Sequence, residues 1–166
     1  AFGENGIGEA SVAEILWPDS EADAARNSLK TTIHRLRHML GRVDAVRVHD
    51  RTVSLDGSCC WVDAWEVRKL LVTVAEPGVR RARLRDGIAL YQGQLFEAHE
   101  GSWLLSARQE LQQCVREAAS ELGRYSERME EWGAAIDVYE KGLAVDEFAE
   151  ELYRRLMVCH EQLGHH

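Results

Sequence analysis

Residues 23–40 read DAARNSLKTTIHRLRHML, and the spacing of their apolar side chains predicts one long helix. The apolar residues recur at steps of three and four, the period that places side chains on one face of an α-helix. We expect this face to be buried; its members are Ala25, Leu29, Ile33, Leu36 and Leu40. Gly41 follows directly and is a suitable residue to end the helix.

The opposite face of this predicted helix is polar and basic. It carries no carboxylate after Asp23, whereas a surface helix that serves only solubility usually mixes both charge signs. Counting 3.6 residues per turn places the following residues on this face or at its edges: Asn27, Lys30, Thr31, His34, Arg35, Arg37 and His38.

A shorter helix is predicted just before it. Gly6 and Gly8 are expected to break regular structure, Ser11 to cap the helix with Glu14 in a capping box, and Pro18 to end it. A short helix, a tight turn and a longer helix with a basic face form the helix-turn-helix arrangement that enters a DNA major groove.

A β-hairpin is predicted after the long helix. Val46, Val48, Val53 and Leu55 alternate with polar residues around positions 49–51. Such a hairpin fits the wing of a winged helix, with Arg47, His49 and Arg51 placed near the phosphates of bound DNA. A plain β-turn with solvated arginines is the alternative.

The charge distribution supports a local anionic partner. The 166-residue chain has a net charge of −8, but residues 24–51 contain seven basic residues and only two acidic ones. One basic segment in an acidic protein indicates a local electrostatic footprint rather than general attraction to nucleic acid.

The remaining sequence predicts helices over 61–74, 79–91 and 103–129, with Pro77-Gly78 ending the first and a loop over 93–101. From Leu122 onward, small and aromatic residues are spaced as in a tetratricopeptide-like (TPR-like) repeat, with a further helix opening near Ala149. Six aromatic residues of the helical part are expected in its core, with a ligand cage as the alternative: Trp61, Trp65, Trp103, Tyr125, Trp132 and Tyr139.

Several stretches resemble, in order, the parts of SARP-type bacterial transcriptional regulators. Residues 15–19 and 25–37 resemble the winged-helix domain of that family, which is related to the DNA-binding half of many response regulators. Residues 61–65, 70–71, 90–93 and 103–111 resemble the bacterial transcriptional activator domain that follows it. The expected fold is therefore mainly α: a partial winged helix-turn-helix with a small β-hairpin over 1–58, then an all-α TPR-like domain over 59–166. The resemblance also implies that the winged helix begins before Ala1 and that further repeats follow residue 166.

The predicted function is DNA binding without catalysis, since the sequence contains no GxxxxGK[ST] loop, no GxGxxG after a strand, no GxSxG elbow and no HExxH motif. The residues expected to read base edges are Asn27, Lys30, Thr31 and His34; those expected to hold phosphates are Arg35, Arg37, His38 and Arg51. The resemblance implies that the helical domain contacts RNA polymerase, another regulatory protein or a second copy of the chain. The alternative function is a TPR-like interaction or oligomerisation module whose winged helix does not read DNA.

The other expectations are negative. Adjacent Cys59 and Cys60 lack the spacer of common zinc sites, so we expect reduced thiols, no metal and no cofactor. No stretch is long and apolar enough to span a membrane, and no leader opens the chain, which predicts a cytoplasmic protein.

Overall fold

The computed structural model describes residues 6–99 and 101–164. Within them, seven helices and three short strands make a mainly α protein, as the sequence predicted. The chain divides into two compact units, Ala1–Trp65 and Glu66–His166, called here the N-terminal and C-terminal units. The boundary expected between residues 58 and 59 stays a prediction.

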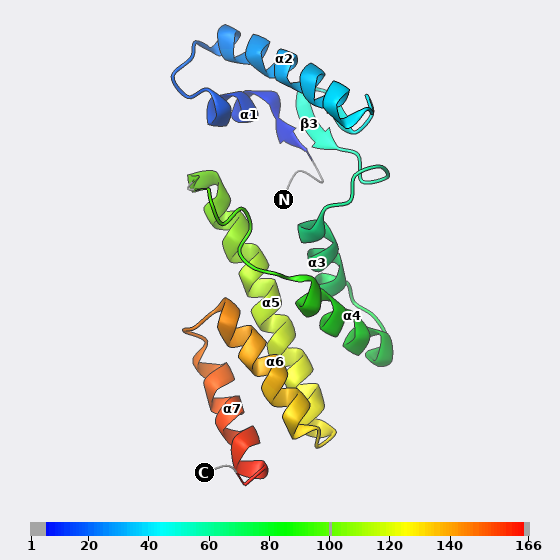
Figure 1. Cartoon of the computed structure of the whole chain (residues 1–166), viewed down its shortest axis with the longest axis vertical. Helices are drawn as coiled ribbons and strands as arrows, with labels where there is room; N and C mark the ends of the chain where they lie inside the picture. The colour runs from blue at the N-terminus through cyan, green and yellow to red at the C-terminus, as the bar shows by residue number, and fades with distance from the viewer. Residues whose placement is uncertain (1–5, 100, 165–166) are drawn as a thin grey trace. The chain divides into compact units, whose positions relative to one another are not determined.

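The N-terminal unit packs two helices and a small antiparallel sheet. Its elements are β1 (Ile7–Gly8), α1 (Glu9–Leu16), α2 (Ala22–Leu40), β2 (Val46–His49) and β3 (Thr52–Leu55), with strand order β1-β3-β2. The long helix and the hairpin confirm the sequence prediction, and Figure 1 shows α2 beside α1. Their shared core consists of Ala13, Ala25, Leu29, Ile33 and Val46.

The start of this unit differs from the prediction. Ile7 pairs with Val53 in β3, although the flanking glycines were expected to break regular structure. A Cβ on Gly6 would overlap the Thr52 side chain, so the glycine lets the two strands approach. The predicted cap at Ser11 is wrong, because α1 begins two residues earlier at Glu9, whose N–H is bound by the Arg51 carbonyl at 2.8 Å.

The buried part of α2 ends before the last of its apolar residues. Leu36 and Leu40 were expected in the core but are 39% and 50% exposed. The reason is length: α1 has 8 residues and α2 has 19, so at about 1.5 Å per residue they span roughly 12 and 28 Å. The last turns of α2 extend beyond the helix that covers its first half.

The C-terminal unit contains helices that pack in chain order. They are α3 (Asp63–Val72, which begins within the N-terminal unit), α4 (Pro77–Leu90), α5 (Ser102–Arg128), α6 (Trp132–Val145) and α7 (Glu150–Gln162). Helix α5 packs against both α4 and α6, and α7 packs against α6 (Figure 1). Pro77 was expected to end a helix, but it begins α4, because a first-turn residue needs no N–H donor.

Tyr139 forms the centre of the contact between α5 and α6. Its side chain is fully buried, and its hydroxyl donates to Glu127 Oε1 at 2.5 Å, while Arg155 from α7 donates to Glu127 Oε2 at 3.0 Å. The ring lies directly against Gly123, where a Cβ would overlap it. Burial, together with the neighbouring Glu127 carboxylate, raises the pKa of Tyr139, so the hydroxyl remains a donor.

Two of the aromatic residues expected in the core lie outside it. Trp61 is 70% exposed and Trp103 is 49% exposed, the latter near the ring of Phe96. Trp61 precedes α3 rather than lying within it, so the helical spacing that suggested burial does not apply to its side chain. Trp103 lies in the first turn of α5, before the stretch that packs against α6.

Candidate nucleic-acid interface

The polar side of α2 is displayed because its opposite side is held in the core. Ala25, Leu29 and Ile33 are all less than 10% exposed and fix the rotation of the helix. The exposed residues of the opposite side, called here the basic face, are Asn27, Lys30, Thr31, His34, Arg35 and His38. The structure therefore brings together on one surface six of the eight residues that the sequence predicted to contact DNA.

The basic and imidazole side chains of the basic face lack polar partners in the described part of the chain. Within residues 6–99 and 101–164, no hydrogen bond or ion pair involves the side chains of Lys30, Arg35 or the two histidines. Thr31 differs, since its hydroxyl donates to the Asn27 carbonyl at 3.0 Å. Unpaired cations on a helix face that carries no carboxylate remain available to an anionic ligand.

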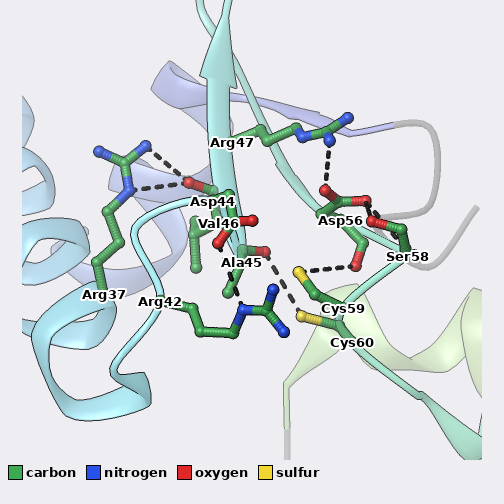
Figure 2. A network of polar contacts seen from close by, with 10 residues as sticks. All are labelled: Arg37, Arg42, Asp44, Ala45, Val46, Arg47, Asp56, Ser58, Cys59 and Cys60. Atoms are coloured by element: carbon green, nitrogen blue, oxygen red, sulfur yellow. Dashed lines mark hydrogen bonds and ion pairs between the residues drawn. The ribbon is translucent and has the colours of Figure 1, made fainter.

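Arg37 takes another position. Its Nε and Nη2 donate to the Val46 carbonyl at 2.9 and 2.7 Å, and the side chain is half-buried (Figure 2). The guanidinium therefore joins the last turns of α2 to the first residue of β2. Its predicted contact with phosphate stays untested, and its observed contacts position the helix relative to the hairpin.

The hairpin turn displays Arg51. Asp50 and Arg51 have φ angles of 47° and 60°, the combination found in the two-residue type I′ turn that matches the twist of the strands. The Arg51 side chain is exposed, and His49 lies 3.2 Å from the Asp50 carboxylate. The backbone thus turns tightly enough to present the Arg51 guanidinium to solvent at the tip.

A hollow beside the basic face includes residues that the sequence reasoning missed. It has a volume of about 380 Å³ and is lined by Trp17, Asn27, Ser28, Thr31, Thr32 and Arg35. Trp17 lies in the stretch 15–19 that resembles the winged-helix domain, but no contact with DNA was predicted for it. Ser28 and Thr32 lie four residues apart, one position after Asn27 and Thr31, and that spacing was the available signal that they share a side of the helix.

The base of the hairpin is stabilised by a buried carboxylate. Asp56, which follows β3, accepts hydrogen bonds from the backbone N–H and the hydroxyl of Ser58 at 2.9 and 2.8 Å, and it pairs with Arg47 from β2 (Figure 2). The Ser58 hydrogen bonds and the Arg47 charge outweigh burial and lower the pKa of Asp56. Arg47, which the sequence placed near phosphates, is thus paired within the protein.

In the C-terminal unit, Arg108 fixes the loop before α5. Its guanidinium donates to the carbonyls of Leu95, Phe96 and His99 at 2.8, 2.6 and 2.7 Å. Phe96 has a φ of 49°, in the left-handed region that costs energy for a residue with a side chain. The three hydrogen bonds hold this loop in its strained conformation.

Among the described residues, no helix combines the length and the hydropathy that a membrane crossing requires. Of the curated proteins, none matches the chain. A family model, the bacterial transcriptional activator domain, matches residues 62–166, which is the larger part of the chain and includes all the helices from α3 to α7. The chain therefore belongs to the bacterial transcriptional activator domain family.

Proposed function

We propose that the chain is a DNA-binding regulator of transcription, in which α1, α2 and the β2–β3 hairpin act as a winged helix-turn-helix. The observation that carries the proposal is the basic face of α2, whose cationic side chains have no hydrogen-bond or ion-pair partner among the residues that the structure describes. The exposed Arg51 at the hairpin tip supplies a further cation in the same unit. A winged helix uses its recognition helix and its hairpin together, with the helix in the major groove and the hairpin against the phosphate backbone of the DNA.

Different roles follow from the positions of the side chains. Asn27, Lys30, Thr31 and His34 would meet base edges, since the first half of a recognition helix lies deepest in the groove. Arg35, His38 and Arg51 would hold phosphates. Arg37 would act as a positioning residue, because its guanidinium is bound to Val46.

The C-terminal unit would connect DNA binding to transcription without catalysis. Membership of the activator-domain family supports contact with RNA polymerase, with another regulatory protein or with a second copy of the chain. A pull-down with purified RNA polymerase and sedimentation of the chain at two concentrations separate these partners.

Fluorescence anisotropy tests the DNA-binding proposal. The chain is titrated against duplex from its own promoter and against random duplex, each at two salt concentrations. We expect Lys30→Ala to cost about 1–3 kcal/mol and to change the site preference. Arg51→Ala should weaken all sequences alike and reduce the salt slope by about 1.

Lys141→Ala is the matched control, because it removes an exposed lysine from α6 in the other unit. Its binding should equal that of the unaltered chain. Equal losses for Lys30→Ala and Lys141→Ala, or an affinity that does not depend on salt, would refute DNA reading by α2.

A second function, protein interaction through the N-terminal unit, is favoured by one observation. The end of α2 and the residues after it expose apolar side chains, with Met39 83% and Val43 74% exposed beside Leu40. An interaction module without DNA reading would lose its partner on Met39→Ser and keep it on Lys30→Ala. The opposite result supports the DNA-binding proposal.

A further inference from the structure

Two adjacent cysteines lie at the base of the β2–β3 hairpin. Cys59 and Cys60 follow β3, and both thiols are half-buried. The Cys59 Sγ donates to the Asp56 carbonyl at 3.6 Å, and the Cys60 Sγ donates to the Ala45 carbonyl at 3.6 Å (Figure 2). Both sulfurs therefore contact the backbone of the segments where the hairpin begins and ends.

Two carboxylates lie close to these cysteines. One ligand atom each from Asp44, Asp56 and Cys59 lies within 4.8 Å of the others. Asp44 comes from the turn before β2, so the fold supplies an oxygen donor that is distant from the cysteines in the sequence. The absence of a metal was predicted because the adjacent cysteines lack a spacer. The structure adds Asp44, a donor 15 residues before Cys59, to Asp56 and the cysteines.

Asp56 is already oriented as a ligand would be. Its Oδ1 accepts both Ser58 hydrogen bonds, while its Oδ2 pairs with Arg47. Carboxylates that bind metals are usually held in this way by neighbouring donors, and Oδ2, which accepts only the Arg47 hydrogen bond, retains a further lone pair for an ion.

The surroundings of the sulfurs favour an added positive charge. The Cys59 Sγ lies close to the carboxylate oxygens of both Asp44 and Asp56. Arg42 lies 3.6 Å from Asp44, and Arg47 pairs with Asp56, so both nearby cations are occupied by carboxylates. A divalent cation bound between oxygen and sulfur would favour the thiolates, whose protons would pass to solvent.

We propose that the base of the hairpin binds one thiophilic divalent cation such as Zn²⁺, with four donor residues: Asp44, Asp56, Cys59 and Cys60. Zinc accepts thiolate sulfur at about 2.3 Å and carboxylate oxygen at about 2.0–2.2 Å in a tetrahedral set. The ligand atoms of Asp44, Asp56 and Cys59 lie within 4.8 Å of one another, and the Cys60 thiol joins them once its side chain rotates away from the Ala45 carbonyl. The bound ion links the turn before β2 to the segment after β3 and thereby stiffens the hairpin.

Titration of the reduced chain with Cd²⁺ tests the site, because cadmium bound to thiolate produces an ultraviolet charge-transfer band that oxygen and imidazole ligands do not. We expect the band to saturate at one equivalent of Cd²⁺. Cys59→Ser and Cys60→Ser should each weaken the band and lower the affinity at least about tenfold. Asp44→Asn should weaken binding and leave the band at saturation unchanged.

Cys114→Ser is the matched control, since Cys114 is a half-buried thiol on α5 in the other unit. Its titration should match that of the unaltered chain. Absence of a band at one equivalent, or a band that survives the Cys59→Ser/Cys60→Ser double variant, overturns the proposal.

A second measurement needs no variant. The unaltered chain is alkylated with iodoacetamide with and without Zn²⁺, and the labelled cysteines are identified by mass spectrometry. Zinc should slow alkylation of Cys59 and Cys60 and leave Cys114 unchanged. Equal alkylation rates at Cys59 and Cys60 with and without zinc also overturn the proposal.

Discussion

Gly123→Ala should destabilise the C-terminal unit, because the new methyl group has no room. A Cβ on Gly123 would overlap Cε1 and Cζ of Tyr139 and lie 2.8 Å from its Cδ1. The ring is fully buried, and its hydroxyl is bound to Glu127, so it cannot rotate away without breaking a hydrogen bond. Overpacking costs typically 1–3 kcal/mol, and we expect the upper end, about 3 kcal/mol. Alanine recovers about 1 kcal/mol of helix propensity, which leaves a net loss of about 2 kcal/mol.

Gly133→Ala provides the matched control for this prediction. Gly133 also lies in a helix, α6, but a Cβ there meets nothing within 4 Å. This variant should therefore be stabilised by up to about 1 kcal/mol. Thermal unfolding followed by circular dichroism measures both. A loss of about 2 kcal/mol corresponds to a fall in Tm of roughly 8–16 °C for a unit of this size. Equal Tm values for the two variants would refute the packing argument.

Three further predictions concern the N-terminal unit and the loop before α5. Arg37→Ala should destabilise the hairpin by about 1.5–3 kcal/mol and speed amide exchange in β2 and β3. Arg35→Ala removes no hydrogen bond or ion pair of the described residues and should leave exchange unchanged. Arg108→Ala releases three carbonyls of the loop over 93–99, so limited proteolysis should cut that loop faster; an unchanged cleavage rate contradicts this role. Asp56 has a lowered pKa, so its contribution to stability is present above its unfolded value of about 3.8 and is lost as the pH falls through its folded value. Asp56→Asn should therefore flatten the acid limb of a stability profile below about pH 4, and an unaltered acid limb would show that this carboxylate does not control it.

The spacing of apolar residues predicted the long helix and the hairpin because this spacing depends on the geometry of a few neighbouring residues. Apolar spacing from Ala25 to Ile33 identified α2 and its buried side, and alternating valines identified the hairpin. Both periodicities follow from backbone geometry alone, so they hold whatever the neighbours are. The same pattern failed at Leu36 and Leu40, since burial also requires a partner, and α1 is too short to cover them.

The candidate interface was predictable in part. Charge and helical position identified the basic face, because the direction of an exposed side chain follows from its angle around the helix. The pattern could not assign Arg37, whose partner is a carbonyl nine residues away in β2. Nor could it find the hollow beside Trp17, which exists only when α1 is packed against α2.

The sequence by itself determined the helices, the hairpin, the local excess of basic residues and the order of parts that resembles a family of regulators. Those features depend on periodicity, turn chemistry and composition, which act over a few neighbouring residues. Only the tertiary structure decided which cations are free and which are paired, and which donors meet across the hairpin base. Among the described residues Lys30 and Arg35 have no polar partner, while Arg37 and Arg47 are bound, although all four lie in one basic stretch of sequence. The reason is that pairing depends on distances set by packing between elements, and a linear pattern does not contain those distances.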